Sequence, residues 1–301
     1  MTTERSAPNS RRLSVLQTWL LGARLRTLPA SIVPVIVGTA AVAPGPIFWD
    51  RAVLALIVAM SLQIGCNYAN DYSDGIRGTD RDRTGPPRLV ASGLASPGAV
   101  KRAAMTAFGV ALLAGIVLSL QSDVRLIIVG CAAIAAAWAY TGGRNPYGYR
   151  GLGEVAVFVF FGLVGTLGSA YVQHQSLSLT AIIAALGVGA LATALLVVNN
   201  LRDIPTDAAS GKVTLAVRIG DVGTRRFYTA LIACAALSVV FLSGIHRPTI
   251  LALAAFGFAD RPLRRIFSQA TGAELIPVLV DTGKLELAFG VLLALGFALP
   301  G

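Results

Sequence analysis

The chain has 301 residues, of which 55% are hydrophobic and only 13% are charged, and its mean hydropathy is +0.70. A soluble domain has about 25% charged residues, so a water-soluble globule of this length could not bury so much apolar surface. These values exclude a soluble enzyme, a disordered protein and a nucleic-acid-binding domain, although the formal net charge is +10. The basic excess therefore needs another explanation.

The first 27 residues differ from the rest of the chain because they are polar and basic. Residues 1–12 contain three arginines and lack the small-residue cleavage site of a signal peptide. Residues 11–27 mix arginines with apolar residues such as Trp19 and Leu20, a pattern typical of an amphipathic helix at a membrane surface. We expect this interfacial segment to lead into the first membrane span.

Nine apolar stretches follow, most of them close to the length of about 20 residues that a membrane-spanning helix needs. They are residues 28–48, 51–70, 100–121, 124–141, 153–173, 178–199, 227–244, 248–266 and 285–300. The eighth stretch is interrupted by Asp260 and Arg261. The predicted fold class is an all-α multi-pass membrane protein of about nine transmembrane helices, forming one domain over residues 1–301.

The distribution of Lys and Arg predicts the orientation of this bundle. Only three of the 25 basic residues, Arg51, Arg125 and Arg247, lie in loops after odd-numbered spans; the other 22 lie in the N-terminus and in the remaining loops. Basic residues concentrate on the cytoplasmic side of a membrane. We therefore expect a cell-membrane protein with a cytoplasmic N-terminus and an external C-terminus, and this asymmetry explains most of the positive charge.

The second span ends in a row of oxygen-bearing side chains. Offsets of 0, 4, 7, 8 and 11 residues place the row on one helix face, and its members are Gln63, Asn67, Asn70, Asp71 and Asp74. Such groups near a membrane are unfavourable unless a ligand compensates them. Hard oxygen ligands suit Mg²⁺, which takes one or two carboxylates and completes its shell with water and substrate phosphate oxygens.

The sixth span ends in a second row, which contains Asn200, Asp203 and Asp207. Pro205 lies between the two aspartates and is expected to break or kink the helix. Lys212 follows in the next loop, where its ammonium group suits a phosphate. Solvated helix ends with ordinary caps are the alternative for either row alone. Opposed across a bundle, the two rows could hold two or more Mg²⁺ ions that bridge one diphosphate.

A nearly constant separation relates the two rows. Asp203 follows Asp71 by 132 residues, and Asp207 follows Asp74 by 133. Both rows end even-numbered spans, so they meet at the same membrane face. We predict two parallel four-helix repeats followed by one further helix, with cytoplasmic active-site loops at residues 71–99 and 200–226.

The two rows resemble the hallmark of the UbiA superfamily of intramembrane prenyltransferases, which has aspartate-rich motifs after the second and sixth of nine helices. The motifs here are residues 67–74, NYANDYSD, and residues 200–207, NLRDIPTD. The resemblance covers nearly the whole chain after residue 20. Residues 70–80, 85–94 and 203–220 favour the branch that prenylates 1,4-dihydroxy-2-naphthoate.

One position departs from the pattern of that superfamily. Many relatives have a third aspartate where this chain has Gly78. The resemblance leaves open whether Asp80 or Asp82 replaces it. The expected metal ligands are aspartates from both motifs and from this insertion, namely Asp71, Asp74, Asp80, Asp203 and Asp207.

The resemblance implies a Mg²⁺-dependent transfer of a polyprenyl group from polyprenyl diphosphate to 1,4-dihydroxy-2-naphthoate. The ring carboxylate is lost as CO₂, which gives demethylmenaquinone in menaquinone biosynthesis. Metal ions and cations aimed at the leaving diphosphate would supply the largest catalytic term. The expected basic groups are Lys212, Arg77, Arg81 and Arg218, and the amides of Asn67, Asn70 and Asn200 would complete or orient the metal shell.

Residues of the loop before the fifth span are candidates for the acceptor side of the site. Tyr140 could shelter the allylic cation through its ring, although tyrosines at helix ends also form the ordinary interfacial belt. Arg144 and Arg150 could meet the aromatic carboxylate. Glu154 is either a proton acceptor or a carboxylate favoured by the dipole of a helix N-terminus.

Two alternatives remain at this stage. The first is a UbiA-type enzyme with another acceptor, such as 4-hydroxybenzoate, homogentisate, haem or a sugar phosphate. The second is a secondary transporter, which also uses repeats and intramembrane carboxylates but needs them near the bilayer midplane. Nothing in the sequence sets the isoprenoid chain length or the oligomeric state.

Overall fold

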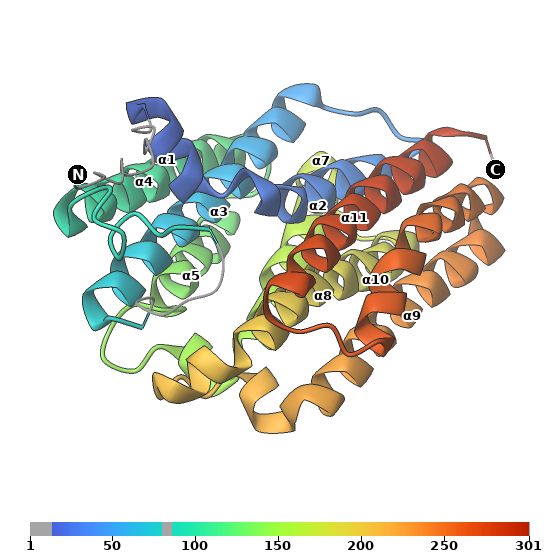
Figure 1. Cartoon of the computed structure of the whole chain (residues 1–301). Helices are drawn as coiled ribbons and strands as arrows, with labels where there is room; N and C mark the ends of the chain where they lie inside the picture. The colour runs from blue at the N-terminus through green and yellow to red at the C-terminus, as the bar shows by residue number, and fades with distance from the viewer. Residues whose placement is uncertain (1–13, 80–85, 301) are drawn as a thin grey trace, which may run out of the picture.

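The computed structural model describes residues 14–79 and 86–300, and every regular element in these ranges is a helix (Figure 1). The N-terminal elements are α1 Val15–Ala23, η1 Leu25–Thr27, α2 Pro29–Ala40, α3 Trp49–Arg77, α4 Pro97–Gln121 and α5 Leu126–Ala139. The central elements are η2 Tyr147–Arg150, α6 Gly153–Val157, η3 Phe158–Gly165, α7 Thr166–His174 and α8 Leu179–Ala209. The last elements are α9 Leu215–Ile245, η4 Arg247–Ala259, α10 Asp260–Phe267, η5 Gly272–Glu274 and α11 Leu275–Ala298.

The predicted all-helical multi-pass fold is confirmed, but the prediction of nine full spans is confirmed only in part. Five helices of the described chain are long and apolar enough to cross a membrane, and a sixth span results if α1, η1 and α2 are joined across their 52° bend. The fourth predicted span is a helix of only 14 residues. The eighth is divided at Asp260 between a 3₁₀ helix and α10. The last span has Asp281, Lys284 and Glu286 in the first half of α11.

The predicted interfacial segment is helical from Val15 to Ala23, while residues 11–13 lie outside the described chain. Ser14 and Gln17 begin α1 with a reciprocal capping box. Arg24 ends α1 in the left-handed conformation, and the chain then turns into α2. Val15 and Leu16 are exposed on α1, as expected of a helix whose apolar side faces lipid.

Both motif rows lie on unbroken helices. Gly78, with φ of 76°, ends α3 directly after the first row. In the second row, α8 continues through Pro205 to Ala209, so the helix is not broken between Asp203 and Asp207. Proline removes one backbone hydrogen bond near the end of the helix. The turn before it, with Leu201, Arg202 and Asp203, is buried, whereas Pro205 itself is exposed.

The close approach of η3 and α8 depends on two glycines. The η3 segment is a π-helix, and a Cβ placed on its Gly162 would lie only 2.4 Å from the Cα of Gly189 in α8. A contact this short leaves no room for a side chain. The pair therefore fixes the position of η3, whose phenylalanines face the site described below.

We predict that Gly162→Ala lowers the thermal stability of the detergent-solubilised protein, because the methyl group must push η3 away from α8. The expected cost is about 1–3 kcal/mol. Gly168→Ala is the matched control, because a Cβ at Gly168 in the same span meets no atom within 4 Å. Equal melting temperatures for the two variants would contradict the close-packing account.

Candidate active site

One cavity of about 750 Å³ contains all four aspartates of the two motif rows in its lining. Residues from α1, α2, α3, α4, α5, α7, α8 and α11 contribute to its wall. The cavity extends along α3 from Ala55 to Asp74, a distance of about 28 Å at the helical rise of 1.5 Å per residue. The apolar wall suits a hydrocarbon chain, and the four carboxylates at the other end suit cations.

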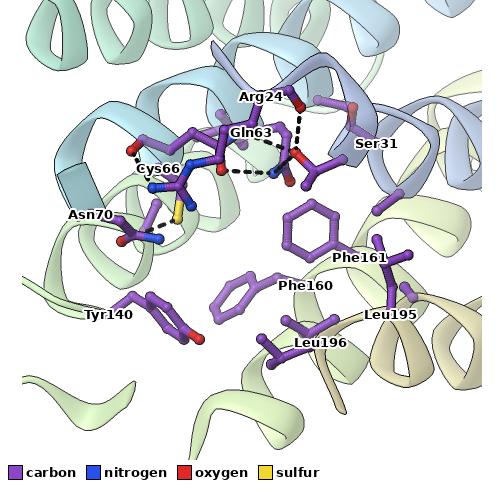
Figure 2. A pocket seen from close by; sticks show the side chains of 18 of the residues that line it. Arg24, Ser31, Gln63, Cys66, Asn70, Tyr140, Phe160, Phe161, Leu195 and Leu196 are labelled. Atoms are coloured by element: carbon purple, nitrogen blue, oxygen red, sulfur yellow. Dashed lines mark hydrogen bonds between the residues drawn. The ribbon is translucent and has the colours of Figure 1, made fainter. Parts of the chain in front are cut away.

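Figure 2 shows how polar and aromatic groups face each other across this cavity. The side chains of Arg24, Gln63 and Asn70 lie on one side, and the ring of Tyr140 lies opposite. Phe160 and Phe161 from the π-helix complete the apolar wall. The π-helix thus supplies two aromatic rings to the pocket, in keeping with the frequent use of such segments at functional sites.

The first row is held by partners from two loops. The carboxylate of Asp71 accepts hydrogen bonds from the backbone N–H groups of Leu89, at 2.9 Å, and Val90, at 3.0 Å. The hydroxyl of Tyr149 donates to Asp74 at 2.6 Å. Burial and the neighbouring Asp74 carboxylate raise the pKa of Tyr149, so its phenol stays a neutral donor. Both aspartates are buried, and their orientation is fixed.

The asparagines of the first row connect helices. The amide nitrogen of Asn67 donates to the backbone oxygen of Ala23 at 2.9 Å and to the hydroxyl of Thr27 at 3.1 Å. Its side-chain oxygen accepts from Gln63 at 3.3 Å. The side-chain oxygen of Asn70 accepts from Thr141 at 2.7 Å. Both amide oxygens are therefore occupied by groups of the chain itself.

The second row combines carboxylates with cations. Arg202 donates from Nε and Nη2 to the two oxygens of Asp203, both at 2.7 Å, and the pair is almost completely buried. Lys212 lies 3.4 Å from Asp207. Asn200 donates to Glu154 at 2.8 Å. The row thus offers both negative ligands for a metal and positive groups for a phosphate.

The predicted site residues fall into three groups. Asn67, Asn70, Tyr140, Asn200 and Lys212 line the cavity beside the four aspartates. Five others do not line it: Arg77, Arg144, Arg150, Glu154 and Arg218. Asp80 and Arg81 lie outside the described residues, as does Asp82.

The predicted arginines that do not line the cavity contact the loop after α5 or line a hollow beside it. Arg77 donates to the backbone oxygens of Thr141 and Gly143, so it joins the end of α3 to the loop after α5. Arg144 and Arg150 line a separate hollow beside that loop. Arg218 is exposed and lies against Gly151, where a Cβ would come within 2.9 Å of its Nε.

Sequence reasoning missed three contributors to the cavity. Arg202 was assigned no role from the sequence. Its position beside Asp203 at the end of an apolar span indicated that each of these two charges needs a buried partner. Phe160 and Phe161 gave no signal, because an apolar pair within an apolar span is indistinguishable from lipid-facing residues. Only the π-helical geometry turns these two rings inward.

The donors of the cavity fit Mg²⁺, which is bound by oxygen ligands. Within residues 14–79 and 86–300, no three acidic, histidine or cysteine side chains form a preformed metal cluster. Mg²⁺ usually takes only one or two protein carboxylates and fills its shell with water and phosphate oxygens. Two pairs of aspartates lining one cavity match that requirement.

The model of the UbiA prenyltransferase family matches residues 31–268. The chain belongs to this family. A relative from Mycobacterium tuberculosis, 1,4-dihydroxy-2-naphthoate octaprenyltransferase, is 51% identical over 92% of this chain and 95% of its own length. The Escherichia coli relative of the same name is 37% identical over 96% of this chain and 97% of its own length.

The fold has counterparts among solved structures of UbiA proteins. A UbiA homolog from Archaeoglobus fulgidus bound to GPP and Mg²⁺ has a TM-score of 0.69, at 13% identity, and the match covers 94% of this chain and 100% of that chain. Identity this low shows the fold alone. The predicted family is confirmed, and the transporter alternative has no support.

We predict that Arg202→Met lowers the free energy of unfolding by about 3–5 kcal/mol, because it removes a buried arginine that donates to both oxygens of the Asp203 carboxylate. Mg²⁺ together with a diphosphate should restore part of this loss, since the cation replaces the missing charge. Denaturant titration in detergent measures both effects.

The matched control for Arg202 is Arg264→Met. Arg264 pairs with Asp260 at the same N···O distance of 2.7 Å, but both side chains are largely exposed. Such a pair contributes at most about 1 kcal/mol. Similar losses in the two variants would show that the Arg202–Asp203 pair has no special role in charge compensation.

Proposed function

We propose that this protein transfers a polyprenyl group from polyprenyl diphosphate to 1,4-dihydroxy-2-naphthoate with loss of CO₂, and so forms demethylmenaquinol, the reduced form of demethylmenaquinone, for menaquinone biosynthesis. Two observations support the proposal. The two aspartate rows line the same largely apolar cavity. Relatives named 1,4-dihydroxy-2-naphthoate octaprenyltransferase match over more than nine tenths of both chains. The cavity supports the donor half of the reaction, and the relatives support the acceptor.

The diphosphate would bind at the polar end of the cavity. Asp71 and Asp74 from α3 would hold Mg²⁺ together with Asp203 and Asp207 from α8, and the ions would neutralise charge on the departing diphosphate. A solved UbiA homolog with Mg²⁺ and GPP, a prenyl diphosphate, supports this assignment. Lys212, 3.4 Å from Asp207, is placed to interact with the same leaving group as a point charge.

The apolar length of the cavity suits the isoprenoid chain and the allylic carbon. When the C–O bond to the diphosphate breaks, the electron pair leaves with the diphosphate, and the allylic carbon carries positive charge. Phe160, Phe161 and Tyr140 exclude water and present ring faces to that charge. The ring carbon then forms the new C–C bond, and the carboxylate leaves as CO₂ with its bonding electrons remaining on the ring.

We further propose that the bundle consists of two four-helix repeats plus α11, with the site at the cytoplasmic face. The equivalent amides Asn67 and Asn200 are 133 residues apart, and each is bonded to the segment that opens its own repeat. Asn67 is bonded to Ala23 and Thr27, and Asn200 to Glu154. The concentration of basic residues on the side of the motif loops supports a cytoplasmic orientation.

We expect purified protein with Mg²⁺ and a polyprenyl diphosphate to prenylate 1,4-dihydroxy-2-naphthoate and release CO₂ and diphosphate in equal amounts. Parallel reactions would contain 4-hydroxybenzoate, homogentisate or a sugar phosphate as the acceptor. Mass spectrometry of the lipid extract identifies the product. No product with dihydroxynaphthoate, but prenylation of another acceptor, would overturn the assigned acceptor and leave the diphosphate site intact.

We expect Asp71→Ala and Asp203→Ala each to reduce diphosphate release by a factor of at least about 10², because each removes a ligand from a different row. Chelation of Mg²⁺ should abolish release by the native protein, and added Mg²⁺ should restore it. Asp260→Ala, which changes an exposed aspartate outside the cavity, is the control. Turnover that persists in both row variants would refute the metal role.

A further inference from the structure

Glu154 is a buried residue next to the second row. The overall reaction releases no net proton, so it does not require the carboxyl group of Glu154 as a proton acceptor. Glu154 begins the span Gly153–His174 and is only 3% exposed. One of its oxygens accepts from the amide nitrogen of Asn200 at 2.8 Å, and the other accepts no hydrogen bond from the described residues. Glu154 itself does not line the cavity, whereas Asn200 does. Its influence on the cavity therefore passes through Asn200.

The bond to Glu154 determines which end of the Asn200 amide faces the cavity. Because its nitrogen donates to the carboxyl group of Glu154, which does not line the cavity, the amide oxygen is the end of Asn200 that is left for a ligand in the cavity. This oxygen accepts no hydrogen bond from the described residues. On α8, Asn200 lies three residues before Asp203 and seven before Asp207, which places the three side chains on one helix face. Asn200 thus adds a neutral oxygen to a pair of carboxylates.

The corresponding amides of the first row are used differently. The oxygen of Asn67 accepts from Gln63, and the oxygen of Asn70 accepts from Thr141. Of the three asparagines in the two rows, Asn200 is the one whose oxygen has no donor within the described chain. The amide oxygens of the first row therefore accept from groups of the chain itself, one within α3 and one in the loop after α5, whereas the oxygen of Asn200 has no such donor among the described residues.

Proton accounting argues against Glu154 as an obligatory base. Loss of the ring carboxylate as CO₂ returns an electron pair to the ring and offsets the positive charge that the allylic group brings. The overall transfer therefore releases no net proton. A carboxyl group kept out of the cavity at this position is better explained by its hydrogen bond than by proton transfer.

We propose that Glu154 is a positioning residue that orients Asn200, so that the amide oxygen of Asn200 binds a divalent cation together with Asp203 and Asp207. The proposal deepens the function given above and depends on its Mg²⁺–diphosphate site, but not on the identity of the acceptor. Hydrogen bonds that orient the ligands of a metal commonly change its affinity by factors of about 10–100 when removed.

The test measures cation binding in the absence of any acceptor. Mn²⁺ as the probe cation would be titrated by electron paramagnetic resonance into detergent-solubilised protein saturated with geranyl diphosphate. We expect Glu154→Leu to weaken Mn²⁺ binding by at least about tenfold. Glu154→Gln should bind almost normally, because its amide oxygen can still accept from Asn200. Asn200→Ala should match Glu154→Leu, and the double variant should be no worse than either.

Glu286→Leu is the matched control for burial. Glu286 in α11 is completely buried, has no hydrogen-bond partner within the described chain, and does not line the cavity. Its replacement should leave Mn²⁺ affinity unchanged. Normal Mn²⁺ binding by Glu154→Leu would overturn the proposal. Weakening of Mn²⁺ binding in Glu154→Gln as large as that in Glu154→Leu would also overturn it, because the side-chain oxygen of glutamine can still accept from Asn200. Failure of the assigned acceptor alone would affect neither result.

Discussion

The compensation of four buried carboxylates is the constraint on which the rest of this structure depends. Asp71, Asp74, Asp203 and Asp207 line one cavity in a membrane protein, where uncompensated charge is costly. Backbone N–H groups, a tyrosine hydroxyl, a buried arginine and a lysine each contact one of them. These partners offset part of the cost of burying the carboxylates, and Mg²⁺ would add further positive charge.

The loops and helix ends around the site serve this same requirement. The loop after α3 reaches back so that Leu89 and Val90 donate to Asp71. The loop after α5 brings Tyr149 to Asp74, and Arg77 ties that loop to the end of α3. Away from the charges, the glycine contact between Gly162 and Gly189 lets the π-helix bring aromatic rings to the cavity. Polar recognition and apolar enclosure are therefore built by different elements.

Much of this site could be predicted from the sequence, because charged residues at the ends of apolar spans are few and their spacing is regular. Asp71 and Asp203, 132 residues apart, do line the same cavity. Local patterns were less informative where packing decides the outcome. Proline propensity suggested a break or kink at Pro205, but α8 continues as a helix through it to Ala209. No sequence pattern indicated that Arg77 donates to backbone oxygens of the loop after α5, because such contacts depend on how the helices pack.

The two rows are expected to act together on one diphosphate. This can be tested by a structure determined with Mn²⁺ and a non-hydrolysable geranyl diphosphate analogue, using the anomalous signal of manganese. We expect manganese peaks between α3 and α8, with ligands from both rows and diphosphate oxygens shared between the ions. A diphosphate bound by Arg202 and Lys212 without metal, or manganese at one row alone, would contradict it.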